Sequence, residues 1–96
     1  MIKKYKIVEV EWLDAEEGGE VGWNSTKEML KIAKKALPLM HTIGYLVHDG
    51  TDHIALLSTF HPDCCSTVEK IPRGMILKIS YLVSEPDEAT PQTPAQ

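Results

Sequence analysis

Residues 41–58 read "HTIGYLVHDGTDHIALLS", and this stretch decides the fold because it places a turn between two apolar runs. Asp49 and Gly50 separate the runs, and an Asp-Gly pair in that position is a strong signal for a β-hairpin. The sequence therefore predicts a strand over 40–48, a turn at "DGTD" and a returning strand over 53–60.

The segments on either side of the hairpin add two further strands. In residues 5–13, Val8, Val10 and Trp12 recur at every second position, which places them on one face of a strand. Residues 75–83 form the last predicted strand. The acidic, glycine-rich stretch "DAEEGGEVGW" and the mixed stretch "HPDCCSTVEKIPRG" are predicted to be loops.

One helix is predicted over residues 25–37. Ser25 and Glu28 have the spacing of a capping box, in which each side chain satisfies a backbone N–H at the helix start. Pro38 stops the helix. The apolar stripe consists of Met29, Ile32, Ala33, Ala36 and Leu37. We expect this stripe to pack on the sheet.

The predicted order of elements is β-α-β-β-β, which is a small α+β domain over residues 1–83. The three later strands carry apolar residues on both faces, and one helix cannot cover both faces of an open sheet. We therefore predict a strongly bent antiparallel sheet or an SH3/Sm-like barrel, assembled as a homo-oligomer. Residues 84–96, "SEPDEATPQTPAQ", contain no large apolar side chain and are predicted to be a disordered tail.

Composition narrows the classes of function. The chain has 96 residues and a formal net charge of -4, which argues against bulk attraction to nucleic acid. Its start lacks the apolar core and the cleavage site of a signal peptide. No apolar run is long enough to cross a membrane. The only two cysteines are neighbours, which favours a reducing cytoplasm over a disulfide framework.

The stretch "HPDCC" (61–65) has the residue types of a metal site but not the spacing. Zinc sites use pairs such as C-x2-C, whereas adjacent cysteines point apart in an extended chain. His48 and His53 flank the hairpin turn, where histidines and aspartates also occur for local reasons. Cys64 or Cys65 could pair with His61 or His41 as nucleophile and base, but no glycine-rich elbow and no ordered third member accompany them. We predict no metal, no cofactor and no catalytic residue, and a loop whose cysteines fill the edge of the core.

Four residues are the candidates for a binding surface. Arg73 stands between a proline and a glycine in "IPRG", where it could grip a phosphate or carboxylate through two parallel hydrogen bonds. Trp23 and Tyr45 offer aromatic faces for stacking, and Asp14 offers a carboxylate. The simpler interpretations are a tight turn at Arg73, a strand-closing turn at Asp14 and a hydrophobic staple at Trp23. A strongly curved sheet could gather the four residues around one shallow site.

Five short motifs, taken in order, resemble those of a family of small uncharacterised proteins from tailed bacteriophages and prophages. The motifs are "VEWLDA" (10–15), "GW" (22–23), "HTIGYLV" (41–47), "HIALLS" (53–58) and "IPRGMILKI" (71–79). The resemblance covers residues 7 to 82 and implies a phage origin and a location in the host cytoplasm. It implies no reaction.

Three functions remain open at this point. The first is a non-catalytic accessory protein that binds a host factor, in its sharper form a sponge that traps a nucleotide-derived immune signal. The second is an Sm-like RNA-binding protein, which Lys3, Lys4 and Lys6 favour and the net charge of -4 opposes. The third is an inhibitor that contacts a host protein directly.

Overall fold

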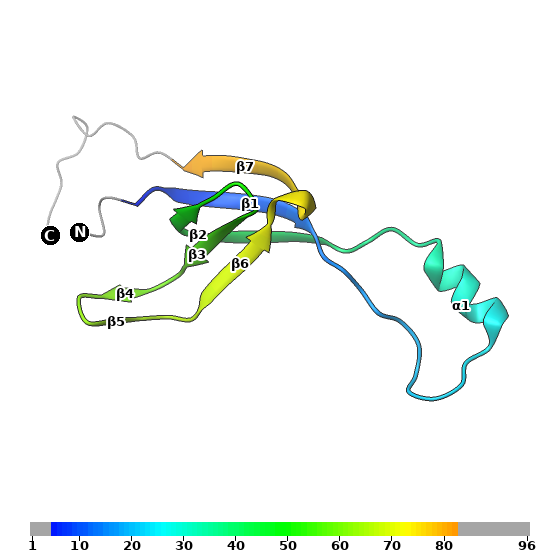
Figure 1. Cartoon of the computed structure of the whole chain (residues 1–96). Coiled ribbons are helices and arrows are strands. Elements are labelled where there is room, and N and C mark those ends of the chain that lie inside the picture. The colour runs from blue at the N-terminus through cyan, green and yellow to red at the C-terminus, as the bar shows by residue number, and fades with distance from the viewer. Residues whose placement is uncertain (1–4, 83–96) are drawn as a thin grey trace, which may run out of the picture.

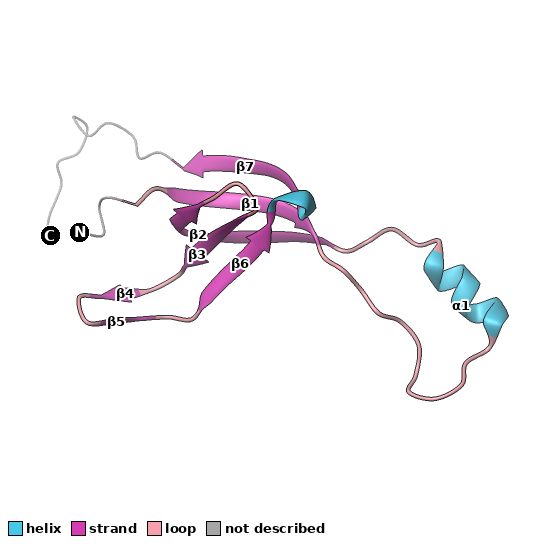
Figure 2. Cartoon of the chain, viewed as in Figure 1, coloured by secondary structure: helices cyan, strands magenta, loops and turns pink. Residues whose placement is uncertain are grey.

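The computed structural model describes residues 5–82 and consists mainly of antiparallel sheet with one helix (Figure 1, Figure 2). The main sheet has five strands in the order β6-β3-β2-β1-β7. Its strands are β1 (Ile7–Leu13), β2 (Leu39–Asp49), β3 (His53–Leu57), β6 (Val68–Pro72) and β7 (Ile76–Leu82). The other elements are the helix α1 (Thr26–Ala33), the short strands β4 (Phe60–His61) and β5 (Cys64–Cys65), and the 3₁₀ turn η2 (Arg73–Met75). The small α+β class is confirmed.

The hairpin that decides the fold forms as predicted, and it bends. β2 and β3 pair antiparallel, and the Gly50 N–H donates to the His53 carbonyl at 3.0 Å. The register shifts between Leu46 and His48, and such a bulge bends a strand and increases its twist. β3 ends earlier than predicted because the N–H groups of Ser58 and Thr59 donate to the Ser66 hydroxyl.

The prediction of a single loop over residues 61–74 is wrong, because three strands form there. β4 and β5 pair as a short hairpin, and β6 pairs with β3 along its whole length. The sequence of β6, "VEKIP", hides its strand character because Ile71 is its only buried residue and a proline ends it. An edge strand with one inward-facing side chain leaves almost no periodic signal.

The sheet curls but does not close into a barrel. β6 and β7 are its two outermost strands, although only the three residues of η2 separate them along the chain. The two edges must therefore approach each other at that end. Within residues 5–82 no ladder joins β6 to β7, so the closed SH3/Sm-like form is not what the chain adopts here.

The core lies on the concave face of the sheet. Val8, Val10, Ile54 and Ile71 are fully buried, and Trp12 and Leu56 join them. The predicted inward face of β1 is thus confirmed. The Trp12 indole N–H donates to the Thr42 hydroxyl at 3.0 Å, which satisfies the one polar atom of that side chain.

Residues 14–38 form an arm that projects from one end of the sheet (Figure 1). The radius of gyration is 19.2 Å, whereas a compact chain of this length has about 12 Å. No residue of α1 is buried. The prediction that the helix packs on its own sheet is therefore wrong.

The helix begins where the sequence predicts and ends early. The Ser25 hydroxyl accepts the Glu28 N–H at 3.3 Å, which confirms the Ser25 half of the predicted capping box. α1 ends at Ala33 rather than Leu37, and the N–H groups of Lys34 and Lys35 bond to carbonyls three residues back. A short helix without a buried face has little to extend it, and Pro38 keeps Leu37 out of helical geometry.

Some predictions fall outside the part of the chain that the structure describes. The predicted tail (84–96) and the lysines Lys3 and Lys4 lie outside the described residues. Among the described residues, no helix has the length and apolar character needed to span a membrane.

Candidate functional site

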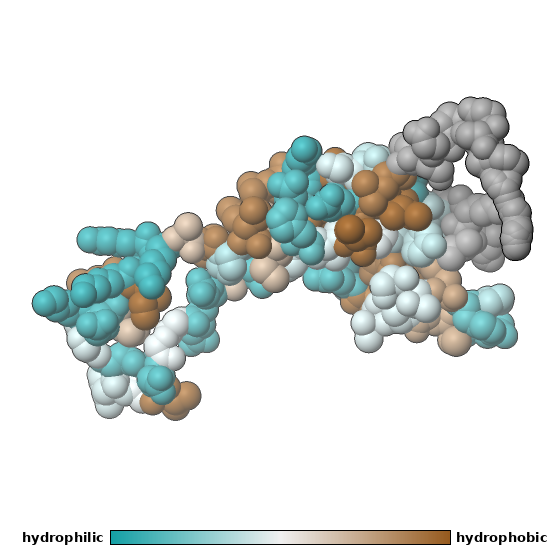
Figure 3. Space-filling view, turned by 180° about the vertical axis from the view of Figure 1, so that it is seen from behind, coloured by the Kyte–Doolittle hydropathy of each residue, from teal (hydrophilic) through white to brown (hydrophobic). Residues whose placement is uncertain are grey.

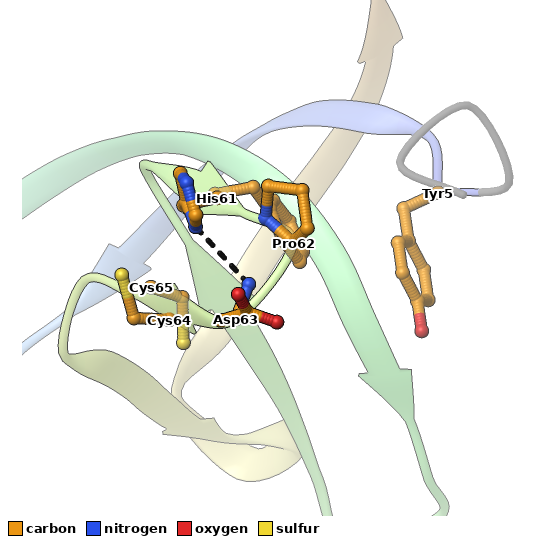
Figure 4. Close-up of a pocket in the computed structure, with 7 residues that line it drawn as sticks. Tyr5, His61, Pro62, Asp63, Cys64 and Cys65 are labelled. Atoms are coloured by element: carbon orange, nitrogen blue, oxygen red, sulfur yellow. Dashed lines mark hydrogen bonds between the residues drawn. The ribbon is translucent and has the colours of Figure 1, made fainter.

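A hollow lies beside the β4–β5 hairpin, and Figure 4 shows the side chains that line it. Its volume is about 550 Å³, which is within the range of small-molecule pockets. Tyr5, Phe60 and the five residues "HPDCC" (61–65) line it. The stretch that looked like a plain loop is thus one wall of a pocket.

Aromatic rings from three parts of the chain meet at this pocket. Tyr5 precedes β1, Phe60 opens β4 and Tyr45 lies in β2. The Tyr5 and Phe60 rings are nearly parallel, with centroids 5.8 Å apart, and Tyr45 meets Phe60 edge-on at 5.4 Å. Both arrangements are favourable for ring quadrupoles. They give the pocket a fixed aromatic wall.

The opposite wall carries polar groups. The Asp63 N–H donates to His61 Nδ1 at 3.1 Å, a bond that closes the turn between β4 and β5 (Figure 4). In the neutral ring this leaves the proton on Nε2, so His61 presents an N–H donor at its other nitrogen. The Asp63 side chain is exposed and adds an acceptor. The pocket can therefore both donate and accept hydrogen bonds at its rim.

The two cysteines of this wall are free thiols, and both are exposed. Neighbouring residues of a strand point to opposite faces, so the two sulfur atoms do not converge. The expectation that Cys64 or Cys65 fills the edge of the core is wrong, because β5 belongs to a hairpin that stands apart from the main sheet.

The structure does not gather the four residues predicted to form one binding surface. Tyr45 pairs with Ile7 at one end of β1, whereas Asp14 follows the other end. Seven residues of strand separate these ends by roughly 20 Å. Trp23 lies in the arm and is 102% exposed, so it staples nothing. Of the four, only Tyr45 approaches the aromatic pocket, through its edge-on contact with the Phe60 ring.

Arg73 holds the hairpin turn instead of facing an open site. Its Nε donates to the Gly50 carbonyl at 2.9 Å, its Nη2 donates to the Asp49 carboxylate, and its backbone N–H donates to the Asp52 carbonyl. The geometry matches the tight-turn interpretation, with a carboxylate of the same chain as the partner. Asp14 has a backbone role of the same kind, because its N–H donates to the Pro38 carbonyl at 3.1 Å and closes the base of the arm.

The histidines of the hairpin turn face each other as their positions suggest. The rings of His48 and His53 stack with centroids 4.7 Å apart. His53 Nδ1 donates to the Asp52 carboxylate at 3.0 Å. This hydrogen bond from the His53 side chain is the main cause that holds the pKa of Asp52 below its ordinary value.

A cluster of metal-capable side chains lies on the convex face of the sheet. Ligand atoms of Glu9, Glu11 and His41 all lie within 4.8 Å of one another, and His41 Nδ1 is 3.3 Å from a Glu9 oxygen. An imidazole and two carboxylates are donors that a divalent metal accepts. Glu9 and Glu11 alternate with Val8, Val10 and Trp12 along β1, whereas His41 joins them only through the β1–β2 register, which no local pattern in the sequence shows.

Sequence reasoning also missed Tyr5 and Phe60, since single aromatic residues at the ends of strands resemble ordinary core positions. The one usable signal was Phe60 directly before "HPDCC", next to a proline and a cysteine pair. In comparisons with known proteins, no family model, no curated protein and no solved structure matches this chain.

Proposed function

We propose that the protein is a non-catalytic binding protein whose pocket beside the β4–β5 hairpin accepts a small planar ligand. The observation that carries this proposal is the aromatic wall of a hollow of about 550 Å³. Planar rings stack on such walls, and each stacked base contributes on the order of 1–3 kcal/mol in nucleic-acid proteins.

A nucleobase is the ligand class that fits both walls. Its face can stack against Tyr5 or Phe60, while its edge meets the Asp63 acceptor and the His61 donor. No lysine or arginine lines the described pocket. The proposed recognition therefore acts on the base and the sugar, and the phosphate role expected for Arg73 is not part of it.

A base-binding pocket fits the first of the functions that the sequence leaves open. The resemblance to phage proteins supports an accessory role in the host cytoplasm, where a nucleotide-derived immune signal offers this chemistry. His61 Nδ1 already accepts the Asp63 N–H, so this atom is not free to take a proton from Cys64 or Cys65, which supports a role without catalysis.

Isothermal titration with adenosine, guanosine, cyclic dinucleotides and ADP-ribose tests the proposal. We expect heat from at least one of these compounds, and the same ligand should bind at least about tenfold more weakly to Tyr5→Leu and Phe60→Leu, because each loses a stacking surface worth more than 1.4 kcal/mol. Tyr81→Leu is the matched control, since Tyr81 is a half-exposed tyrosine of β7 that does not line the pocket.

The same titrations separate the alternatives. Salt-sensitive binding of single-stranded RNA, with no binding of free nucleosides, would favour the RNA-binding function instead. If none of the compounds and no RNA binds, the pocket proposal is wrong, and direct contact with a host protein remains as the function to pursue.

A further inference from the structure

One side of the arm helix presents an apolar residue between two positive charges. Leu30 is 58% exposed, and Lys27 and Lys34 lie three residues before it and four after it, on the same side of the helix. Two other apolar residues of α1, Met29 and Ile32, turn towards Gly18 and Gly19 in the opposite limb of the arm. We call Lys27, Leu30 and Lys34 the arm ridge.

The convex face of the sheet presents the complementary arrangement. Glu9 lies directly opposite Ile43 across β1 and β2, and Glu11 lies opposite His41. Ile43 is 59% exposed. Within residues 5–82 no ion pair joins either glutamate to a lysine or arginine, although Lys78 of β7 lies opposite Glu11, and the Glu9 carboxylate pairs with His41. We call Glu9, Glu11 and Ile43 the sheet patch.

The two surfaces match in charge and in scale. The lysines of the arm ridge are seven residues apart on a helix, about 10 Å, and the glutamates of the sheet patch are about 7 Å apart on a strand. Lysine side chains are long enough to absorb the difference. Leu30 would then lie over Ile43, and each lysine would reach one glutamate.

The arm ridge and the sheet patch of one chain lie apart. The arm projects away from the sheet (Figure 1), and the space-filling view in Figure 3 shows its side chains as a separate body beyond the strands. The bond from the Asp14 N–H to the Pro38 carbonyl closes the arm at its base. An isolated helix of eight residues is not stable in water, so the arm needs a surface to cover it.

We propose that the arm of one copy docks on the convex sheet face of a second copy, and that the second copy returns the same contact. Complementary surfaces that cannot meet within one chain lead to self-association, and a reciprocal contact closes as a two-fold symmetric dimer. The docking covers Leu30 and Ile43 in both copies and neutralises both pairs of glutamates. None of the residues of the arm ridge or the sheet patch lines the aromatic pocket.

Charge reversal tests which surfaces meet. We expect the full chain to be a dimer by light scattering and sedimentation. Glu9→Lys with Glu11→Lys, and separately Lys27→Glu with Lys34→Glu, should each raise the dimer dissociation constant at least about tenfold, which is 1.4 kcal/mol. Lys70→Glu is the control for charge reversal, because Lys70 is an exposed residue of the edge strand β6 that belongs to neither surface and should leave the dimer intact.

Mixing the two reversed variants gives the sharper result. In the mixed pair, the unchanged arm ridge of the glutamate variant meets the unchanged sheet patch of the lysine variant. The reversed arm ridge of the lysine variant meets the reversed sheet patch of the glutamate variant. Opposite charges therefore meet in both contacts. The two variants, monomeric alone, should therefore form a heterodimer with one copy of each. A wild-type chain that stays monomeric at all concentrations would overturn the proposal, as would a dimer that survives both reversals.

A disulfide cross-link tests the same contact without charge reversal, in case a charge-reversed variant fails to fold. Leu30→Cys with Ile43→Cys, placed in a Cys64→Ser, Cys65→Ser background, should give disulfide-linked dimers on mild oxidation. Leu30→Cys with Leu77→Cys is the control, because Leu77 is equally exposed at 59% but lies on β7. Equal cross-linking at both positions, or none at Ile43, would show that the arm docks elsewhere or does not dock.

Discussion

Thr42 has one task that a hydrophobic residue of the same shape cannot perform. Its hydroxyl accepts the Trp12 indole N–H at 3.0 Å, inside the edge of the core. Thr42→Val should lower the free energy of unfolding by about 1 kcal/mol, because it leaves that donor without a partner. Thr42→Ser retains the oxygen and should lose less. Urea denaturation measures both, and a valine variant as stable as the wild type would mean that water replaces the hydroxyl.

Gly44 and Gly74 have opposite tolerance for a side chain. A Cβ at Gly44 would lie 2.9 Å from the Leu57 carbonyl oxygen, which belongs to the paired strand, whereas nothing lies within 4 Å of a Cβ at Gly74. Gly44→Ala should therefore destabilise the fold by about 1–3 kcal/mol. Gly74→Ala should be neutral or slightly stabilising. Thermal unfolding of the pair checks the contrast, and equal effects would contradict it.

At the scale of elements, Arg73 ties η2 to the β2–β3 turn. Its side chain is 38% exposed and its carboxylate partner 51%, so solvent screens the ion pair and the hydrogen bond to Gly50 supplies much of the contact. Arg73→Ala should lower the free energy of unfolding by about 1 kcal/mol. Arg73→Lys should recover only part of the loss, because lysine lacks the planar fork.

The sequence alone also allowed a binding role for Arg73, in which its side chain grips a phosphate or carboxylate and its removal would not affect the fold. Lys70→Ala is the control for surface charge, since Lys70 is an exposed residue of the adjacent strand β6. An alanine variant at Arg73 that melts like the wild type would restore the binding interpretation.

The β2–β3 turn should also respond to acid. The pKa of Asp52 in the fold lies below its ordinary value of 3.8, chiefly because of the hydrogen bond from His53. A lowered pKa means that the ionised carboxylate stabilises the fold above about pH 4, and that this contribution is lost as the pH falls through the folded-state value. The stability difference between the wild type and Asp52→Asn should therefore shrink on acidification below pH 4. A difference independent of pH would contradict this.

The sequence predicts elements well where their own residues carry the signal. The alternation around Val8 and Val10 and the Asp49-Gly50 turn specify β1 and the hairpin locally. β6 escaped prediction because Ile71 alone faces the core. The position of the helix was not predicted, because amphipathic spacing shows that one face of a helix must be covered but does not show which surface covers it.

The candidate site was less predictable than the fold for a related reason. Tyr5, Tyr45 and Phe60 come together through pairing between distant segments, and no local pattern specifies that register. Arg73 was recognised as held in a rigid turn, but its partner Asp49 lies more than twenty residues earlier. The sequence shows which residue types are present, but it does not show which residues become neighbours in the fold.

At the scale of the whole molecule, the arm is separable from the sheet. Its ends are already joined by the bond from the Asp14 N–H to the Pro38 carbonyl. Replacing residues 15–37 with Asn-Gly, a pair suited to a two-residue hairpin, should leave the five-stranded sheet folded and monomeric. Circular dichroism and light scattering check the two expectations. An unfolded product would show that the arm supports the sheet, and a dimeric product would show that self-association does not need the arm.

The pairing of the first strand with the last has a consequence during synthesis. β1 is a central strand, and its neighbour β7 begins more than sixty residues later. At about 5–20 residues per second, the ribosome leaves one edge of β1 open for roughly 3–13 seconds after β1 emerges. Val8 and Val10 remain partly uncovered throughout that interval. The nascent chain is therefore most prone to aggregate just before its last described strand emerges, and long-range pairing of this kind also slows folding.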